Sequence, residues 1–74
     1  MKSNNELLEA SKLHFKAKCA RAEANLKNYL NNPVAIGEHP DLVEEVIKLV
    51  QQIAEAKEAL ECIGQYEVLN ENQN

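Results

Sequence analysis

The chain has 74 residues, 45% of them hydrophobic and only 4% aromatic, and a formal net charge of −4. Two Gly and two Pro are too few turn residues for a fold of many strands, so the composition predicts a small all-α protein with one domain. The acidic balance argues against broad electrostatic binding of DNA, RNA or an anionic membrane.

The first half of the chain predicts a helix over about residues 4–31. Ser3 and Glu6 fit a capping box at its start, and Pro33 ends it, because proline disfavours a helical residue before it. Apolar side chains recur on one face, which we call the seam of this helix: Leu8, Phe15, Cys19, Ala22, Leu26 and Tyr29. Lys12 interrupts this seam, where its methylene stem can lie along apolar neighbours.

The second half predicts a helix over about residues 40–63. Either Pro40 is its first residue, or Asp41 caps it and Glu44 completes a capping box. Its seam follows coiled-coil steps of four and three: Leu42, Val46, Leu49, Ile53, Ala56, Leu60 and Ile63. Gly64 is expected to end this helix, which divides the chain into a hairpin at 1–64 and a partly disordered tail at 65–74.

The short connection predicts that the two helices pack antiparallel, pairing residues whose numbers sum to about 71 or 72. This register places Ala22 against Leu49 and Phe15 against Ala56, so that a large side chain meets a small one.

Charge favours the same hairpin, because residues 1–32 carry a net charge of +3 and residues 33–74 a net charge of −7. In the predicted register Lys16 lies near Glu55. The same register places Lys27 near Glu44 and Glu45.

Each helix carries more apolar surface than one hairpin can cover. The second helix has a second apolar row, Val43, Ile47, Val50 and Ala54, and the first has an alanine-rich row, Ala10, Leu13, Ala17, Ala20 and Ala24. We therefore expect a homo-oligomeric bundle whose interfaces include Ala17, Ala20, Ala24, Val43, Ile47 and Val50. Val34 and Ile36 in the connection are expected to plug the bundle end or to touch a neighbouring copy.

A polar row follows the first helix at steps of four and three: His14, Lys18, Arg21, Asn25 and Asn28. Two cations, an imidazole and two amides beside an interface could bind an anionic, nucleotide-like ligand between subunits. Arg21 would bind phosphate oxygens as a fork, and the amides would contact polar edges. The alternative is the solvated face of an amphipathic helix.

The connection places His39 beside Glu38 and Asp41. This group could be a metal pair or an acid–base site, or a turn held by its own hydrogen bonds. We expect the turn, and no metal.

The run from Asn32 to Asp41, with a helix on each side, resembles small uncharacterised helical-hairpin proteins of tailed bacteriophages. The resemblance covers about residues 25–63 and carries no catalytic motif. It implies an accessory protein in an infected bacterial cell. Such a protein would act by binding, either to block a host protein or to sequester a nucleotide signal of host defence.

No apolar run is long enough to cross a membrane and the start lacks the apolar core of a signal peptide, so we expect a cytoplasmic protein. Cys19 and Cys62 are then expected to be free thiols.

Motifs for phosphate loops, nucleophile elbows and metal-binding His pairs are absent from the sequence, so we expect a non-enzymatic protein without a cofactor. The favoured hypothesis is sequestration of a small anionic, nucleotide-like signal between subunits. The alternative is a coiled-coil adaptor or inhibitor that binds a host protein through its exposed apolar helix face.

Overall fold

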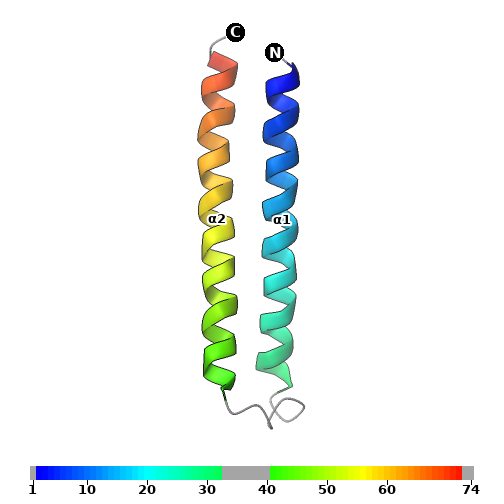
Figure 1. Cartoon of the computed structure of the whole chain (residues 1–74), viewed down its shortest axis with the longest axis vertical. Helices are drawn as coiled ribbons and strands as arrows, with labels where there is room; N and C mark the ends of the chain where they lie inside the picture. The colour runs from blue at the N-terminus through cyan, green and yellow to red at the C-terminus, as the bar shows by residue number, and fades with distance from the viewer. Residues whose placement is uncertain (1, 33–40, 73–74) are drawn as a thin grey trace.

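The protein is a long antiparallel hairpin of two helices, seen in a computed structural model that describes residues 2–32 and 41–72 and side chains within 6–32 and 41–69 (Figure 1). Helix α1 spans Lys2–Asn31 and helix α2 spans Leu42–Asn72. The Cα trace measures 55 × 14 × 14 Å. The described residues contain no strand, and within them neither helix carries an apolar stretch that could cross a membrane.

The helix boundaries at the connection follow local hydrogen bonds. The Asn32 backbone N–H donates to the Asn28 carbonyl at 3.0 Å, and the Asn32 side-chain amide donates to Asn28 Oδ1 at 3.1 Å, which closes α1. The Glu45 N–H donates to the Asp41 carbonyl at 3.1 Å, so Asp41 occupies the cap position of α2. Pro40, the other predicted start, lies outside the described residues.

The first helix begins earlier than predicted, at Lys2 rather than near residue 4. Ser3 therefore lies inside α1 and not before it, and its side chain, on which the predicted capping box with Glu6 depends, lies outside the described side chains.

The expected end of the second helix at Gly64 is also wrong, because α2 continues through Gly64 to Asn72. A glycine inside a helix costs only about 0.5–1 kcal/mol relative to alanine. At the end of a helix, glycine is favoured where the residue that ends the helix adopts a positive φ. No described residue has a positive φ. The segment 65–72, expected to be tail, is helical, while residues 73 and 74 lie outside the described part.

We expect the substitution Gly64→Ala to stabilise the protein by about 0.5–1 kcal/mol, because alanine restricts the unfolded chain and favours a helix. A Cβ placed on Gly64 meets no atom within 4 Å, so the new methyl group causes no clash. Urea unfolding followed by circular dichroism measures the change. A destabilised Gly64→Ala variant would show that α2 does not run through this position.

The core is one narrow line of side chains between the helices. Four described residues are buried, and all four belong to the predicted seams: Ala22, Leu49, Ala56 and Ile63, at 2%, 8%, 0% and 9% exposure. Small residues at the closest approach let the two backbones pack tightly. The heptad pattern thus predicted correctly which face of each helix turns inward.

The register between the helices differs from the predicted one. Within the described side chains, two ion pairs join the helices: Lys12 with Glu67 at 2.7 Å, and Glu23 with Lys57 at 3.8 Å. The residue numbers of these pairs sum to 79 and 80, about one heptad beyond the predicted sum. Side chains lean toward the N-terminus of their own helix, in opposite directions in antiparallel helices, so facing pairs have higher numbers than a level alignment suggests.

The predicted ion pairs are consequently not formed in the described part of the chain: Lys16 with Glu55, and Lys27 with Glu44 or Glu45. The predicted packing of Ala22 against Leu49 and of Phe15 against Ala56 stays a prediction. The seam residues themselves are unaffected, because a shift of one heptad returns each to the seam.

Lys12 is held at the α1–α2 junction by charge. The hydrogen bond from its amine to Glu67 raises its pKa, and the attraction of Glu67 and Glu9 adds to this against partial desolvation. The pKa of Lys12 in the folded state lies above the ordinary 10.5. The ion pair with Glu67 therefore stabilises the fold fully below pH 10.5, and this stabilisation is lost as the pH rises through the raised pKa.

We therefore expect Lys12→Met to lower the melting temperature at neutral pH, and this difference from the wild type to shrink above about pH 10.5. Lys48→Met is the matched control, because Lys48 contacts only Glu45 of its own helix, at 3.8 Å. Thermal melts at several pH values measure both. A Lys12→Met difference that persists undiminished at pH 12 would contradict the assigned ion pair.

Candidate functional site

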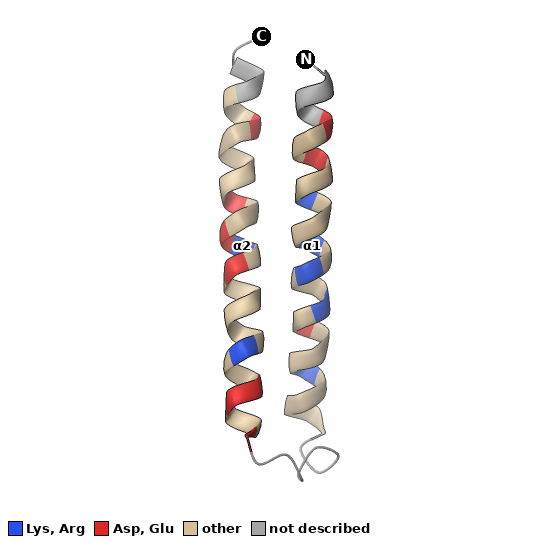
Figure 2. Ribbon diagram, viewed as in Figure 1, with Lys and Arg blue, Asp and Glu red and all other residues tan. Residues whose placement is uncertain are grey.

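The two helices carry opposite charge on their surfaces (Figure 2). Basic side chains lie mainly on α1 and acidic ones mainly on α2. Among the described residues, four α1 cations have no carboxylate within ion-pair distance: Lys16, Lys18, Arg21 and Lys27. The same holds for Glu55, Glu58 and Glu61 on α2. Each helix thus presents charges that have no ion-pair partner among the described side chains.

The polar row of α1 forms a shallow hollow of about 300 Å³ lined by His14, Ala17, Lys18 and Arg21. The structure therefore brings together three of the five predicted ligand residues around one alanine of the alanine-rich row. Asn25 and Asn28 do not line this hollow. The Asn28 side chain instead accepts the hydrogen bond from Asn32.

The chemistry of this hollow suits an anion only partly. Lys18 and Arg21 supply two cations one turn apart, and the small side chain of Ala17, which also lines the hollow, leaves space for a ligand atom. However, all four lining residues come from one helix, so a ligand would be covered from one side alone. Small-molecule sites normally enclose most of the ligand surface. A second wall, from another copy, is needed to complete the predicted cleft.

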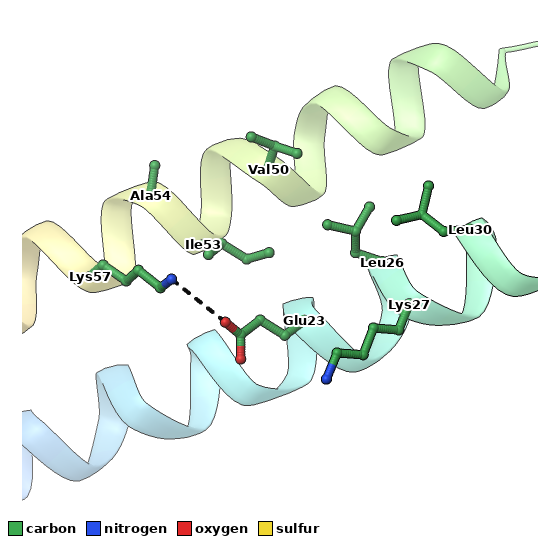
Figure 3. A pocket seen from close by; sticks show the side chains of 8 residues that line it. All are labelled: Glu23, Leu26, Lys27, Leu30, Val50, Ile53, Ala54 and Lys57. Carbon is green, nitrogen blue, oxygen red and sulfur yellow. Dashed lines mark ion pairs between the residues drawn. The ribbon is translucent and has the colours of Figure 1, made fainter.

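A larger hollow, which we call the apolar groove, runs between the two helices and measures about 520 Å³. Its lining residues are Glu23, Leu26, Lys27 and Leu30 from α1 and Val50, Ile53, Ala54 and Lys57 from α2. Leu26 and Ile53 lie between the helices, and the Glu23–Lys57 ion pair closes one end (Figure 3). This groove has an apolar floor and a charged rim, the composition typical of a helix-docking surface.

The second apolar row of α2 is exposed, and two of its members, Val50 and Ala54, line the apolar groove. Val43, Ile47 and Val50 are 73%, 44% and 49% exposed. The alanine-rich row of α1 is also exposed, including Leu13. The prediction that one hairpin leaves both rows uncovered is confirmed, whereas the oligomer inferred from it stays a prediction.

Sequence reasoning missed the α1 side of the apolar groove. Leu30 belonged to no predicted row although it is a large apolar residue at 63% exposure. Its spacing of four from Leu26 was a usable signal, because residues four apart share one helix face.

A third hollow lies on α2 alone and measures about 510 Å³, lined by Glu55, Glu58, Ala59, Glu61, Cys62 and Gln65. Cys62 is exposed, Cys19 is half-buried in the α1 seam, and both are free thiols. The acidic hollow was not predicted, although its residues recur at helical spacing.

The predicted features of the connection lie outside the described residues: Val34, Ile36, Gly37, Glu38 and His39. Within residues 2–32 and 41–72, no group of three His, Cys, Asp or Glu side chains is arranged to hold a metal ion.

Comparison of the chain with protein-family models, with curated proteins and with solved structures finds no match.

Proposed function

We propose that this chain is a non-enzymatic binding protein that works as an assembly of helical hairpins. The observation that carries the proposal is that few side chains are buried, whereas many large apolar side chains are exposed. Four described residues are buried, while large apolar side chains on both helices are 44% to 73% exposed.

A hairpin of this kind is poorly stabilised alone. Two helices of 30 and 31 residues must be ordered, at a cost of about 1–2 kcal/mol per residue for the backbone. One thin line of buried side chains gives little to offset that cost, and small domains with insufficient cores commonly oligomerise. Covering the apolar groove and the second apolar row with further helices supplies the missing burial.

Native mass spectrometry of the gently purified protein tests this proposal, because it counts subunits and detects retained small molecules together. We expect a homo-oligomer. A chain that stays monomeric at about 100 µM, where a micromolar association would be nearly complete, contradicts self-assembly. A monomer captured by a host protein through the second apolar row would instead favour the adaptor hypothesis.

A second candidate function is binding of a small anionic, nucleotide-like molecule at the hollow lined by His14, Lys18 and Arg21. The specific observation that favours it is the pair of cations without carboxylate partners beside an exposed alanine. In an assembly, another copy against the alanine-rich row would supply the second wall of the site.

We expect Arg21→Ala to weaken binding of ATP by about tenfold or more, because a charge-assisted fork to phosphate is lost. Lys16→Ala is the matched control: Lys16 is an exposed α1 cation that does not line the hollow. Isothermal titration calorimetry with ATP and with inorganic phosphate measures both variants. Equal effects of the two substitutions would indicate nonspecific attraction and remove the site.

The setting that we propose is the cytoplasm of an infected bacterial cell, because residues 25–63 resemble phage hairpin proteins. There the assembly would counter host defence, by sequestering a nucleotide signal or by blocking a host protein.

A further inference from the structure

We propose that a second copy of this chain occupies the apolar groove, in a four-helix assembly whose two-fold axis runs along the length of the hairpins. The inference rests on the proposed self-assembly and specifies its surface and its orientation. Each α1 then packs against the α2 of the other copy.

The apolar groove is a surface that further helices can cover. Leu30 at its α1 edge is 63% exposed and Val50 at its α2 edge is 49% exposed, with Leu26 and Ile53 half-buried beneath them. An edge from each helix and a floor between them match the space that a facing pair of helices fills in a four-helix bundle.

The groove covers only the half of the hairpin nearest the connection. Lys12 lies eighteen residues before Leu30, which is five full helical turns, so both residues lie on the same side of α1. At the level of Lys12 this side carries the Lys12–Glu67 ion pair, and next to Glu67 in sequence the exposed Val68. A partner that fits the whole face must therefore be apolar at the groove and must accommodate an ion pair at the other end.

A second copy meets this requirement when the two-fold axis is parallel to the helices. In that arrangement every level of one hairpin faces the same level of the other, so the two grooves coincide and the two ion-paired ends coincide. All neighbouring helices are antiparallel, as in common up-down bundles.

Charge selects this arrangement over its alternative. With the axis along the hairpins, α1 faces the partner's α2, and the two halves of the chain carry net charges of +3 and −7. With the axis across the hairpins, α1 would face α1 and α2 would face α2, so that like charges meet. At the end of the groove that the Glu23–Lys57 ion pair closes, Glu23 of each copy then faces Lys57 of the other copy. Opposite charges therefore meet twice across the interface.

The hollow lined by Lys18 and Arg21 shares no residue with the apolar groove. Dimer formation through the groove therefore does not supply the second wall of the candidate anion site, which needs a further copy against the alanine-rich row.

The first test replaces Leu30, at the α1 edge of the apolar groove. We expect Leu30→Glu to weaken dimerisation by about 100-fold or more in sedimentation equilibrium, because dimerisation would then bury a carboxylate against the apolar groove. Leu7→Glu is the matched control, an exposed leucine of the same helix at 69% exposure that neither lines the groove nor belongs to the alanine-rich row. Unchanged dimerisation of Leu30→Glu overturns the proposal.

The second test measures orientation and leaves the groove intact. Spin labels are attached at Glu6→Cys in a background of Cys19→Ala and Cys62→Ser, and the distance between the two labels of a dimer is measured by pulsed electron resonance. With the axis along the hairpins, both labels lie at the same end, about 15–30 Å apart, given interhelical spacings of 8–10 Å. With the axis across the hairpins and the groove at the centre, the helical rise places them more than about 50 Å apart.

The outcomes separate this inference from the proposed function. A wild-type chain that is monomeric defeats self-assembly and the inference together. A dimer that ignores Leu30→Glu, or whose labels are about 35 Å or more apart, retains self-assembly and overturns only the groove and its orientation.

Discussion

Replacing Leu49 by alanine should lower the free energy of unfolding by about 2–5 kcal/mol, because it removes a buried side chain and leaves a cavity that the two helices cannot fully close. Leu49 is the largest of the four buried residues together with Ile63, and it lies about two turns inside α2, which begins at Leu42. For a protein with so small a core, this loss is enough to unfold much of the population at room temperature.

Leu69→Ala is the control for Leu49→Ala, because Leu69 lies on the same helix at 53% exposure. We expect it to change stability by less than about 1 kcal/mol. Urea unfolding monitored by circular dichroism, at one fixed protein concentration, measures both variants. Similar losses in the two variants would mean that the seam is not the core.

Replacing Ala22 by leucine should destabilise the hairpin by about 1–3 kcal/mol, because the larger side chain overfills the space between the helices. Ala22 is 2% exposed at the interface of α1 and α2, and a larger side chain there must push the helices apart. The same change at the exposed Ala20 is expected to be nearly neutral or slightly stabilising, since leucine is a good helix former. Thermal unfolding of the two variants gives the comparison. Equal stability of both would show that the helices do not pack closely at Ala22.

The inward faces of both helices could be predicted from the sequence because helical periodicity depends only on local spacing. Ala22, Leu49, Ala56 and Ile63 all belong to the predicted seams and are the buried residues of the described part. Side chains three and four residues apart share a face whatever the helix packs against.

The register could not be predicted in the same way, because a heptad repeat looks the same after a shift of seven residues. Only contacts that break the repeat select one alignment, and here these are the ion pairs of Lys12 with Glu67 and of Glu23 with Lys57. The helical segment after Gly64 was missed for a related reason. Glu67 is held by its contact with the distant Lys12, and no local pattern contains that contact.

The two candidate sites also differ in whether local spacing alone could predict them. His14, Lys18 and Arg21 come together because their spacing on one helix suffices. The apolar groove needs side chains from both helices, such as Leu30 and Val50, and so depends on the register.

The dependence of thermal stability on protein concentration tests the central claim, that this hairpin completes its core by self-assembly, most directly. Melting curves recorded by circular dichroism from about 1 µM to 1 mM cover the range in which an association of micromolar affinity saturates. We expect the melting temperature to rise steadily with concentration, because association stabilises the folded hairpin by mass action. A melting temperature that is the same throughout this range would show that the hairpin folds alone, and would contradict the account.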